Sequence, residues 1–94
     1  MEPIDEAARL FAVLSHPQRL RVLSLLSDGE PRSAGTLQEA LGLERTAMSH
    51  QLRVLRDARL VSATRDGRHQ LYTLADHHVA HIVGDAIAHV SEAS

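Results

Sequence analysis

Residues 43–58 read LERTAMSHQLRVLRDA, and this stretch decides the fold. Apolar residues recur in it at the spacing of an α-helix, whereas the positions between them are polar or arginine. The face predicted to lie inward comprises Ala47, Leu52, Leu55 and the stem of Arg59. A helix with one apolar face for the core and one basic face outside is typical of a DNA-recognition helix.

A second, shorter helix is predicted immediately before this stretch. Ser33 can cap its N-terminus with the side-chain oxygen, and Gly42 suits the residue after its end at Leu41. Two helices joined at residues 41–43, the second of them basic, form the helix-turn-helix pattern.

A β-hairpin is predicted to follow the basic helix. Residues 60–65 and 70–74 have the composition of strands, and they flank Asp66-Gly67, a dipeptide typical of tight hairpin turns. The tip of this hairpin carries Arg65, Arg68 and His69. A basic hairpin in this position is the wing of a winged helix-turn-helix.

Helices are also predicted at both ends of the chain. One ends before His16, another begins at Pro17, and a last helix begins at Asp76. The apolar stripe of the last helix consists of Val79, Ile82, Val83, Ala86, Ile87 and Val90. The predicted fold class is therefore mainly α with a small β-hairpin, a winged helix-turn-helix of five helices and a two-stranded wing. Residues 1–94 are predicted to form a single domain, because a chain of this length cannot build a second core.

The composition narrows the chemistry of the chain. It contains no cysteine, so disulfides, thiolate metal sites and thiol redox chemistry are excluded. No apolar run approaches the ~20 residues of a membrane span. The acidic start lacks the basic and apolar regions of a signal peptide. We therefore expect no membrane partner and a cytoplasmic location.

The charges are segregated, although the formal net charge is only −2. Residues 44–69 hold six arginines against three acidic residues, a net charge of +3. Residues 70–94 hold no lysine or arginine, three acidic residues and four of the seven histidines. The basic middle is expected to face double-stranded DNA, and the acidic, histidine-rich end to do something else.

The recognition helix is expected to lie in the major groove with its N-terminal side chains nearest the bases. The candidates for base contacts are Thr46, Ser49, His50 and Gln51. The candidates for phosphate contacts are Arg45, Arg53, Arg65 and Arg68, with the wing pair near a minor groove. The alternative is an ordinary solvated helix face, and His50 has the further alternative of packing against the preceding helix.

The last helix carries four side chains of metal-ligand type: Asp76, His78, His89 and Glu92. His78 and His89 lie within about 20° of one helix face but roughly 16 Å apart along the axis. Two nitrogens that each lie about 2 Å from one zinc ion cannot be so far apart, so one helix cannot close this site. Two copies packed antiparallel can, and symmetry then gives two equivalent sites per homodimer. Two imidazoles and two carboxylates suit tetrahedral Zn²⁺ and also Co²⁺.

A rival site within one chain uses His77 and His81, an i, i+4 pair, with Asp85 one turn further. A six-coordinate metal such as Ni²⁺ needs two more donors than the quartet supplies, and His81 or the N-terminus is a conceivable source. A histidine-rich solvated helix that binds no metal is the remaining interpretation.

The segments TAMSHQLRVLR (46–56), LV (60–61), RDGRH (65–69) and YTL (72–74) together resemble the ArsR/SmtB family of bacterial metalloregulatory repressors. The resemblance extends roughly from Leu10 to Glu92. It implies a homodimer formed by the first and last helices, which represses its operon when metal-free and leaves operator DNA when metal binds. The quartet in the last helix resembles the interhelical zinc site of the family.

The resemblance implies two further points. The far ring nitrogen of His89 would donate to the backbone carbonyl of Arg59, at the end of the recognition helix. Ser33 stands where several members place a cysteine, so a soft-metal site built from that helix and the N-terminal arm is excluded.

Other functions fit the sequence less well. The main alternative is a repressor of the same family that senses nickel, cobalt or a non-metal signal, and no small organic substrate is expected. A zinc hydrolase needs an open coordination position and a general base, but the sequence has no His-Glu-x-x-His helix. We therefore expect no enzymatic activity. A metal-buffering protein would explain the histidines but not the recognition helix and wing.

Overall fold

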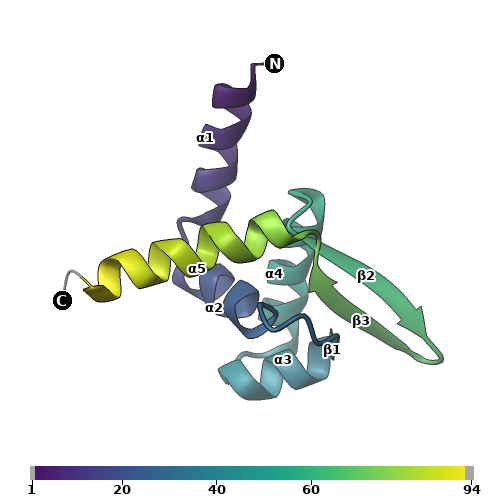
Figure 1. The fold of residues 1–94 in the computed structure, drawn as a ribbon. Coiled ribbons are helices and arrows are strands. Elements are labelled where there is room, and N and C mark those ends of the chain that lie inside the picture. The colour runs from purple at the N-terminus through teal and green to yellow at the C-terminus, as the bar shows by residue number, and fades with distance from the viewer. Residues whose placement is uncertain (1, 93–94) are drawn as a thin grey trace.

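The computed structural model describes residues 2–92, and the elements in that range follow the predicted order (Figure 1). They are α1 (Pro3–Leu14), α2 (Pro17–Leu25), β1 (Arg32–Ser33), α3 (Ala34–Leu41), α4 (Arg45–Asp57), β2 (Val61–Asp66), β3 (His69–Leu74) and α5 (His77–Glu92). The prediction of a mainly α winged helix-turn-helix, with five helices and a hairpin, is confirmed. Within this range no helix is long and apolar enough to cross a membrane.

Local signals set the ends of the helices that build the helix-turn-helix. The Ser33 hydroxyl accepts a hydrogen bond from the backbone N–H of Thr36 at 3.1 Å, which caps α3 as predicted. Gly42 ends α3 in a left-handed conformation with φ 66°, where a residue without Cβ is favoured. The short turn that follows directs α4 across α3.

The wing is part of a three-stranded antiparallel sheet with the strand order β1-β3-β2. The expectation of a two-stranded wing is therefore incomplete, because β1 pairs with β3 through Arg32 opposite Tyr72 and Ser33 opposite Leu71. A strand of two residues is too short to show any periodicity in the sequence. This pairing fixes the start of α3 against the base of the wing.

An ion pair holds the connection between α2 and β1. The Arg32 guanidinium donates to both carboxylate oxygens of Asp28, at 2.8 and 2.6 Å, and to the backbone carbonyl of Leu25 at 2.7 Å. The hydrogen bond from Arg32 holds the pKa of the Asp28 carboxyl well below its usual value of 3.8. The contribution of this ion pair to the stability of the fold is therefore fully present above pH 3.8, and it is lost progressively as the pH falls below that value. Because the pair is exposed to solvent, its contribution is small.

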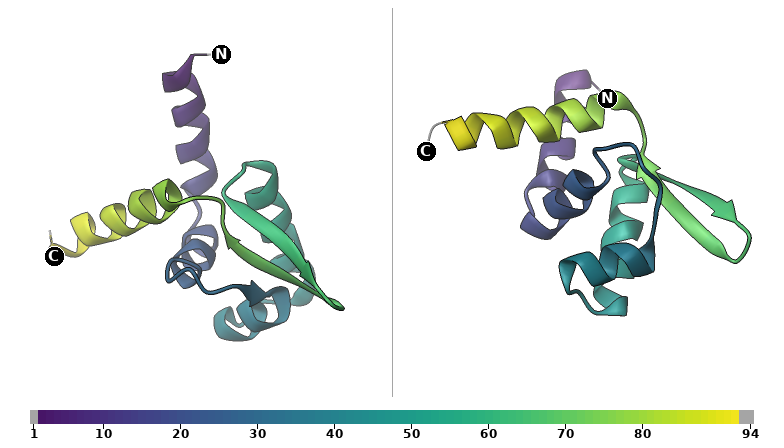
Figure 2. Two further views of the ribbon diagram at one scale, coloured as in Figure 1. Left: turned by 45° about the vertical axis from the view of Figure 1, so that its right-hand side comes forward. Right: turned by 60° about the horizontal axis from the view of Figure 1, so that its bottom comes forward.

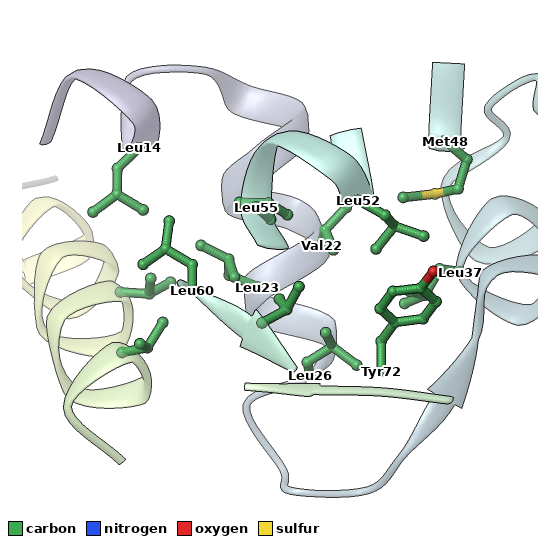
Figure 3. Packing of buried hydrophobic residues seen from close by; sticks show 13 residues of the cluster. Leu14, Val22, Leu23, Leu26, Leu37, Met48, Leu52, Leu55, Leu60 and Tyr72 are labelled. Atoms are coloured by element: carbon green, nitrogen blue, oxygen red, sulfur yellow. The ribbon is translucent and has the colours of Figure 1, made fainter. Parts of the chain in front are cut away.

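One apolar core joins all five helices to the sheet. Its buried residues are Leu14, Val22, Leu23, Leu26, Leu37, Met48, Leu52, Leu55, Leu60, Val61, Tyr72, Val79 and Val83. Figure 3 shows Leu14 of α1, Leu23 of α2 and Leu55 of α4 directed into this interior. The prediction that Ala47 faces inward is wrong: Ala47 is exposed, and the neighbouring Met48 is only 1% exposed. The larger side chain takes the core position, where it buries more apolar surface.

The chain leaves the C-terminal end of α4 through Arg59, a residue with a left-handed backbone conformation. Arg59 has φ 61°, its N–H donates to the Arg56 carbonyl at 2.9 Å, and the Leu60 N–H donates to the Leu55 carbonyl at 2.9 Å. This pair of bonds is the Schellman motif that closes many helices. The expectation that the stem of Arg59 lies inward is wrong, because the chain leaves the helix at this residue and its side chain is exposed.

Arg59→Gly is expected to stabilise the protein. Glycine would relieve the roughly 1–2 kcal/mol that a left-handed conformation costs an ordinary residue in the folded protein. Its greater freedom in the unfolded chain would cancel about 0.5–1 kcal/mol of that stabilisation. The net stabilisation is up to about 1.5 kcal/mol, or a rise in Tm of roughly 6–12 °C at that upper value. Ala58→Gly, at an adjacent residue with an ordinary φ of −83°, is the matched control and should lower the Tm. A lower Tm for Arg59→Gly would contradict the assignment.

Candidate functional site: a DNA-binding face and a paired-helix face

The outer face of α4 is exposed and basic, as predicted. Five candidate DNA contacts lie on it with exposed side chains: Arg45, Thr46, Ser49, His50 and Arg53. The alternative that His50 packs against the preceding helix is not supported, since its side chain is exposed. The buried face of the same helix consists of Met48, Leu52 and Leu55, so packing on one side leaves the other free.

A hollow of about 480 Å³ lies between α4, the start of α3 and the base of the wing. Its lining residues are Ala34, Ser49, Leu52, Arg53, Arg56, Asp57 and Tyr72. Arg56 was absent from the predicted contacts, although its position three residues after Arg53 on an exposed face was a usable signal. Two guanidinium groups on one side of a groove can hold phosphate oxygens through charge-assisted hydrogen bonds.

The wing extends away from the core beside α4 (Figure 1). Its register places Asp66 opposite His69, so Gly67 and Arg68 form a two-residue loop. Gly67 has φ 62°, a conformation that suits glycine at the first position of such a loop. Arg65 and Arg68 are exposed near this tip, where they are available for DNA phosphates or a minor groove.

Gln51 differs from the other candidates on α4 because it is half-buried and has a partner. Its side-chain oxygen Oε1 accepts a hydrogen bond from Arg19 Nε at 2.9 Å. Arg19 lies in the first turn of α2, and its Nη1 also donates to the backbone carbonyl of Val13 at 3.2 Å. The sequence offered no signal for this contact, since 32 residues separate the pair.

The four candidate metal ligands lie along α5 and at its start, and all four side chains are exposed. Asp76 Oδ1 accepts a hydrogen bond from the backbone N–H of Val79 at 3.2 Å, which caps the N-terminus of α5. In the described range, Asp28 and Arg32 form the only ion pair, so neither Asp76 nor Glu92 is held by one. Within one chain, His78 and His89 lie near opposite ends of α5.

The imidazoles of His77, His78 and His81 cluster at the N-terminal end of α5. The ring centroids of His77 and His78 are 4.1 Å apart, and those of His77 and His81 are 5.6 Å apart. Between residues 2 and 92 of one chain, however, no three or more His, Asp or Glu side chains form a group that could hold a metal ion. The rival site of His77, His81 and Asp85 is thus not assembled in the single chain.

A second face of the molecule is formed by the outer sides of α1 and α5. Both helices extend away from the body, and the residues of α5 after Val83 are all exposed (Figures 1 and 2). Every large hydrophobic residue that is exposed between residues 2 and 92 lies in these two helices, namely Ile4, Phe11, Ile87 and Val90. An apolar hollow of about 230 Å³ lies between them and is lined by Phe11, Leu14, Ser15, Leu20, Ile82, Val83 and Ala86. Exposed apolar surface of this extent is typical of an association site.

Comparison with known proteins agrees with this architecture. A family model described as a helix-turn-helix domain matches residues 14–62. The chain is 40% identical over 91 residues to the protein named HTH-type transcriptional repressor SmtB from Mycobacterium tuberculosis. The aligned region covers 97% of this chain and 67% of that protein. The crystal structure of Rv0081 from Mycobacterium tuberculosis is similar with a TM-score of 0.86 at 37% identity, covering 99% of this chain and 94% of that one.

A solution structure from Mycobacterium bovis is similar with a TM-score of 0.86 at 30% identity, covering 95% of this chain and 82% of that one. It is named as the homodimeric winged helix-turn-helix DNA-binding domain of a possible ArsR-family transcriptional regulator. The fold, the matching family model and the identity to a named repressor agree on one class of protein, which is a transcriptional regulator and not an enzyme. The chain belongs to the ArsR/SmtB family of winged helix-turn-helix transcriptional regulators.

Proposed function

We propose that the protein is a metal-responsive transcriptional repressor, a homodimer that binds operator DNA when metal-free and releases it when Zn²⁺ binds between its C-terminal helices. The observation that carries the DNA-binding part is the exposed arginine-rich face of α4 beside an arginine-lined hollow and the wing. Its 40% identity to a protein named as a repressor supports the direction of regulation. We expect this activity in the cytoplasm, where bacterial DNA lies.

The DNA-binding residues divide into two roles. Thr46, Ser49 and His50 lie on the exposed part of α4 that would face base edges in the major groove. The arginines would hold the phosphates and so place the helix in register: Arg45, Arg53 and Arg56 on α4 and Arg65 and Arg68 on the wing. Because such contacts release counterions, affinity should fall steeply as salt rises.

The dimer would form through the outer faces of α1 and α5. Two copies related by a two-fold axis would bury Phe11 and Ile87, which are 58% and 41% exposed in one chain. Burying a phenylalanine side chain is worth about 1.5–3 kcal/mol, so covering this face is strongly favourable. A similar protein of known structure is named as homodimeric, which supports this arrangement.

The donors of α5 fit a zinc ion that two chains share. Asp76 and His78 of one protomer, together with the partner's His89 and the partner's Glu92, supply two nitrogens and two oxygens. All four side chains are exposed and none makes an ion pair in the described range, so they are available as ligands. When bound, the ion would contribute a fixed crosslink between the two α5 helices.

Release of DNA then follows from linkage between two binding sites. The two α4 helices of a dimer must lie about one DNA turn apart, ~34–36 Å, to enter successive major grooves. Residues that hold α5 against its partner also set that spacing, because α5 packs on α2 and β3 of the DNA-binding body. The far nitrogen of His89 donating to the carbonyl of Arg59, at the end of α4, would connect the two faces. DNA must weaken metal binding by the same factor as metal weakens DNA binding.

A second candidate is a sensor of Ni²⁺ or Co²⁺ on the same scaffold. The observation in its favour is the cluster of three imidazoles at the start of α5, in which the ring of His77 lies 4.1 Å from that of His78 and 5.6 Å from that of His81. Additional nitrogens so close to His78 would suit a metal that prefers six ligands.

The test is a selection of duplexes from a random pool by the metal-free protein, followed by titration of the selected duplex with and without Zn²⁺, Co²⁺ and Ni²⁺. We expect a sequence with two-fold symmetry and half-sites one helical turn apart. Bound Zn²⁺ should weaken binding by about 5–150-fold, the usual range of allosteric coupling. If the protein selects no duplex, its proposed role as a repressor is contradicted. If it selects a duplex but none of the three metals changes its affinity, only the proposed metal sensing is contradicted.

A further inference from the structure

The recognition helix has one directional side-chain contact with the rest of the molecule. Among the residues from 2 to 92, side chains more than four positions apart form a single hydrogen bond, from Arg19 Nε to Gln51 Oε1 at 2.9 Å. The same guanidinium donates through Nη1 to the Val13 carbonyl at 3.2 Å. One arginine therefore connects the last turn of α1, the first turn of α2 and the middle of α4.

The other anchors of α4 are apolar. Met48, Leu52 and Leu55 attach the helix to the core, but apolar burial depends on area and has little directional preference. A hydrogen bond needs both a short distance and an aligned angle, so it fixes rotation and sliding that apolar contacts permit. Gln51 is adjacent to His50 and two residues from Ser49, so its anchoring sets how these side chains are presented.

The hydrogen bond also limits what Gln51 can do at a DNA base. To read adenine, a glutamine uses its oxygen and its nitrogen together, accepting from one base atom and donating to another. The oxygen of Gln51 already accepts from Arg19, and the side chain is half-buried. Arginine suits the opposite role, since its planar group can donate to two acceptors on different helices at once.

We propose that Arg19 is a positioning residue, which holds the DNA-reading face of α4 against α1 and α2, and that Gln51 serves as its acceptor instead of contacting a base. This inference rests on the proposed DNA-reading role of α4. It also connects the two faces of the molecule, because α1 carries Phe11 of the proposed dimer surface and Val13 of this contact.

The test is a double-mutant cycle with Arg19→Met and Gln51→Met, which keep an unbranched aliphatic stem at each position and remove the hydrogen bond. Operator affinity is measured by fluorescence anisotropy on the duplex selected by the wild-type protein. Gln51→Met should raise Kd about tenfold, and Arg19→Met at least as much, because it also removes the bond to the Val13 carbonyl. The double variant should raise Kd no further than Arg19→Met alone, because Arg19→Met already removes the contact with Gln51. Arg21→Met is the matched control: it removes the same charge from α2 and breaks only a local bond to Gln18, so Kd should change less than twofold.

Two further readouts separate positioning from direct contact. The slope of log Kd against log salt should be the same for Arg19→Met as for the wild type, since Arg19 neutralises no phosphate. The base preference of Gln51→Met in a repeated selection should be unchanged at every position. Multiplicative effects of the two substitutions, or a preference relaxed at one base pair by Gln51→Met alone, would overturn the proposal.

The cycle also distinguishes failure of this inference from failure of the proposed function. If the wild-type protein selects a duplex and the cycle is multiplicative, only the positioning role is wrong. If the wild-type protein selects no duplex, the proposed function is wrong. The double-mutant cycle is then measured with the free energy of unfolding in place of operator affinity. Non-additive changes there would support the contact between Arg19 and Gln51, and additive changes would overturn it.

Discussion

Phe11→Glu is expected to convert the dimer into monomers and to weaken operator binding by about 100-fold to 10,000-fold. A charge at this position would have to be buried without a partner when two copies pair, because the surroundings in the hollow between α1 and α5 are almost entirely apolar. A monomer reaches one half-site only, and it loses the gain from joining two binding events, which is typically about 10²–10⁴-fold. Sedimentation velocity gives the oligomeric state, and fluorescence anisotropy gives the affinity.

Phe11→Leu is the matched variant for this experiment. It keeps an apolar side chain on the same exposed turn of α1, so the dimer and the operator affinity should be retained to within about threefold. Circular dichroism checks that Phe11→Glu remains folded, as expected for a side chain that is 58% exposed in the single chain. A Phe11→Glu protein that stays dimeric and binds the operator like the wild type would contradict the assigned interface.

His89→Gln is expected to leave operator binding intact and to abolish its response to zinc. The imidazole lies on the exposed last turns of α5, so its replacement should change neither the fold nor the metal-free affinity by more than about twofold. The weakening of operator binding by zinc that we propose for the wild type, about 5–150-fold, should disappear. A gel-shift titration with increasing Zn²⁺ measures both quantities, and retained release would contradict the role given to His89.

His81→Gln is the control for that experiment. This imidazole lies on the same helix but belongs to the rival set with His77, and it should keep zinc-dependent release if the quartet is the site. Loss of release in His81→Gln with normal release in His89→Gln would reverse the assignment in favour of the N-terminal cluster. Loss of the Ni²⁺ response alone in His81→Gln would support the six-coordinate alternative.

Most of the fold could be predicted because its elements carry strong local signals. The caps at Ser33 and Gly42, the proline at the start of α2 and the tight turn at Gly67 each depend on the chemistry of one or two residues. The helical spacing of residues 43–58 was long enough to identify α4 and its outer face. The five exposed candidates on that face follow directly from this spacing.

The incorrect or incomplete predictions fall where tertiary packing, the end of a helix or strand pairing determines the position of a residue. Ala47 and Met48 both fit an apolar helix face, and only the volume available in the core selects Met48. The helical spacing predicted Arg59 as an inward position, but the left-handed residue ends the helix before that rule applies. The two-residue strand β1 depends on pairing with β3, whose partner residues lie about 40 positions later in the chain.

The candidate sites were predictable as sets of residues and not as assembled groups. Charge and spacing selected the exposed arginines of α4 and the candidate metal ligands of α5, because these properties are local. The contact between Arg19 and Gln51 joins residues far apart in the chain, so it appears only once the helices are packed. The four candidate metal ligands are separated along α5, and their assembly into the proposed site would depend on a second copy of the chain.

Zinc titration of mixed dimers tests most directly whether two chains hold each metal ion between them. His78→Gln and His89→Gln proteins are each expected to lose tight zinc binding, because every shared site then lacks one imidazole. A heterodimer of the two variants, purified with different tags, has one site that lacks both imidazoles and one that is intact. We predict one tightly bound Zn²⁺ per heterodimer, seen as Co²⁺ absorption or by calorimetry. No tight binding by the heterodimer would contradict a site shared between the two α5 helices.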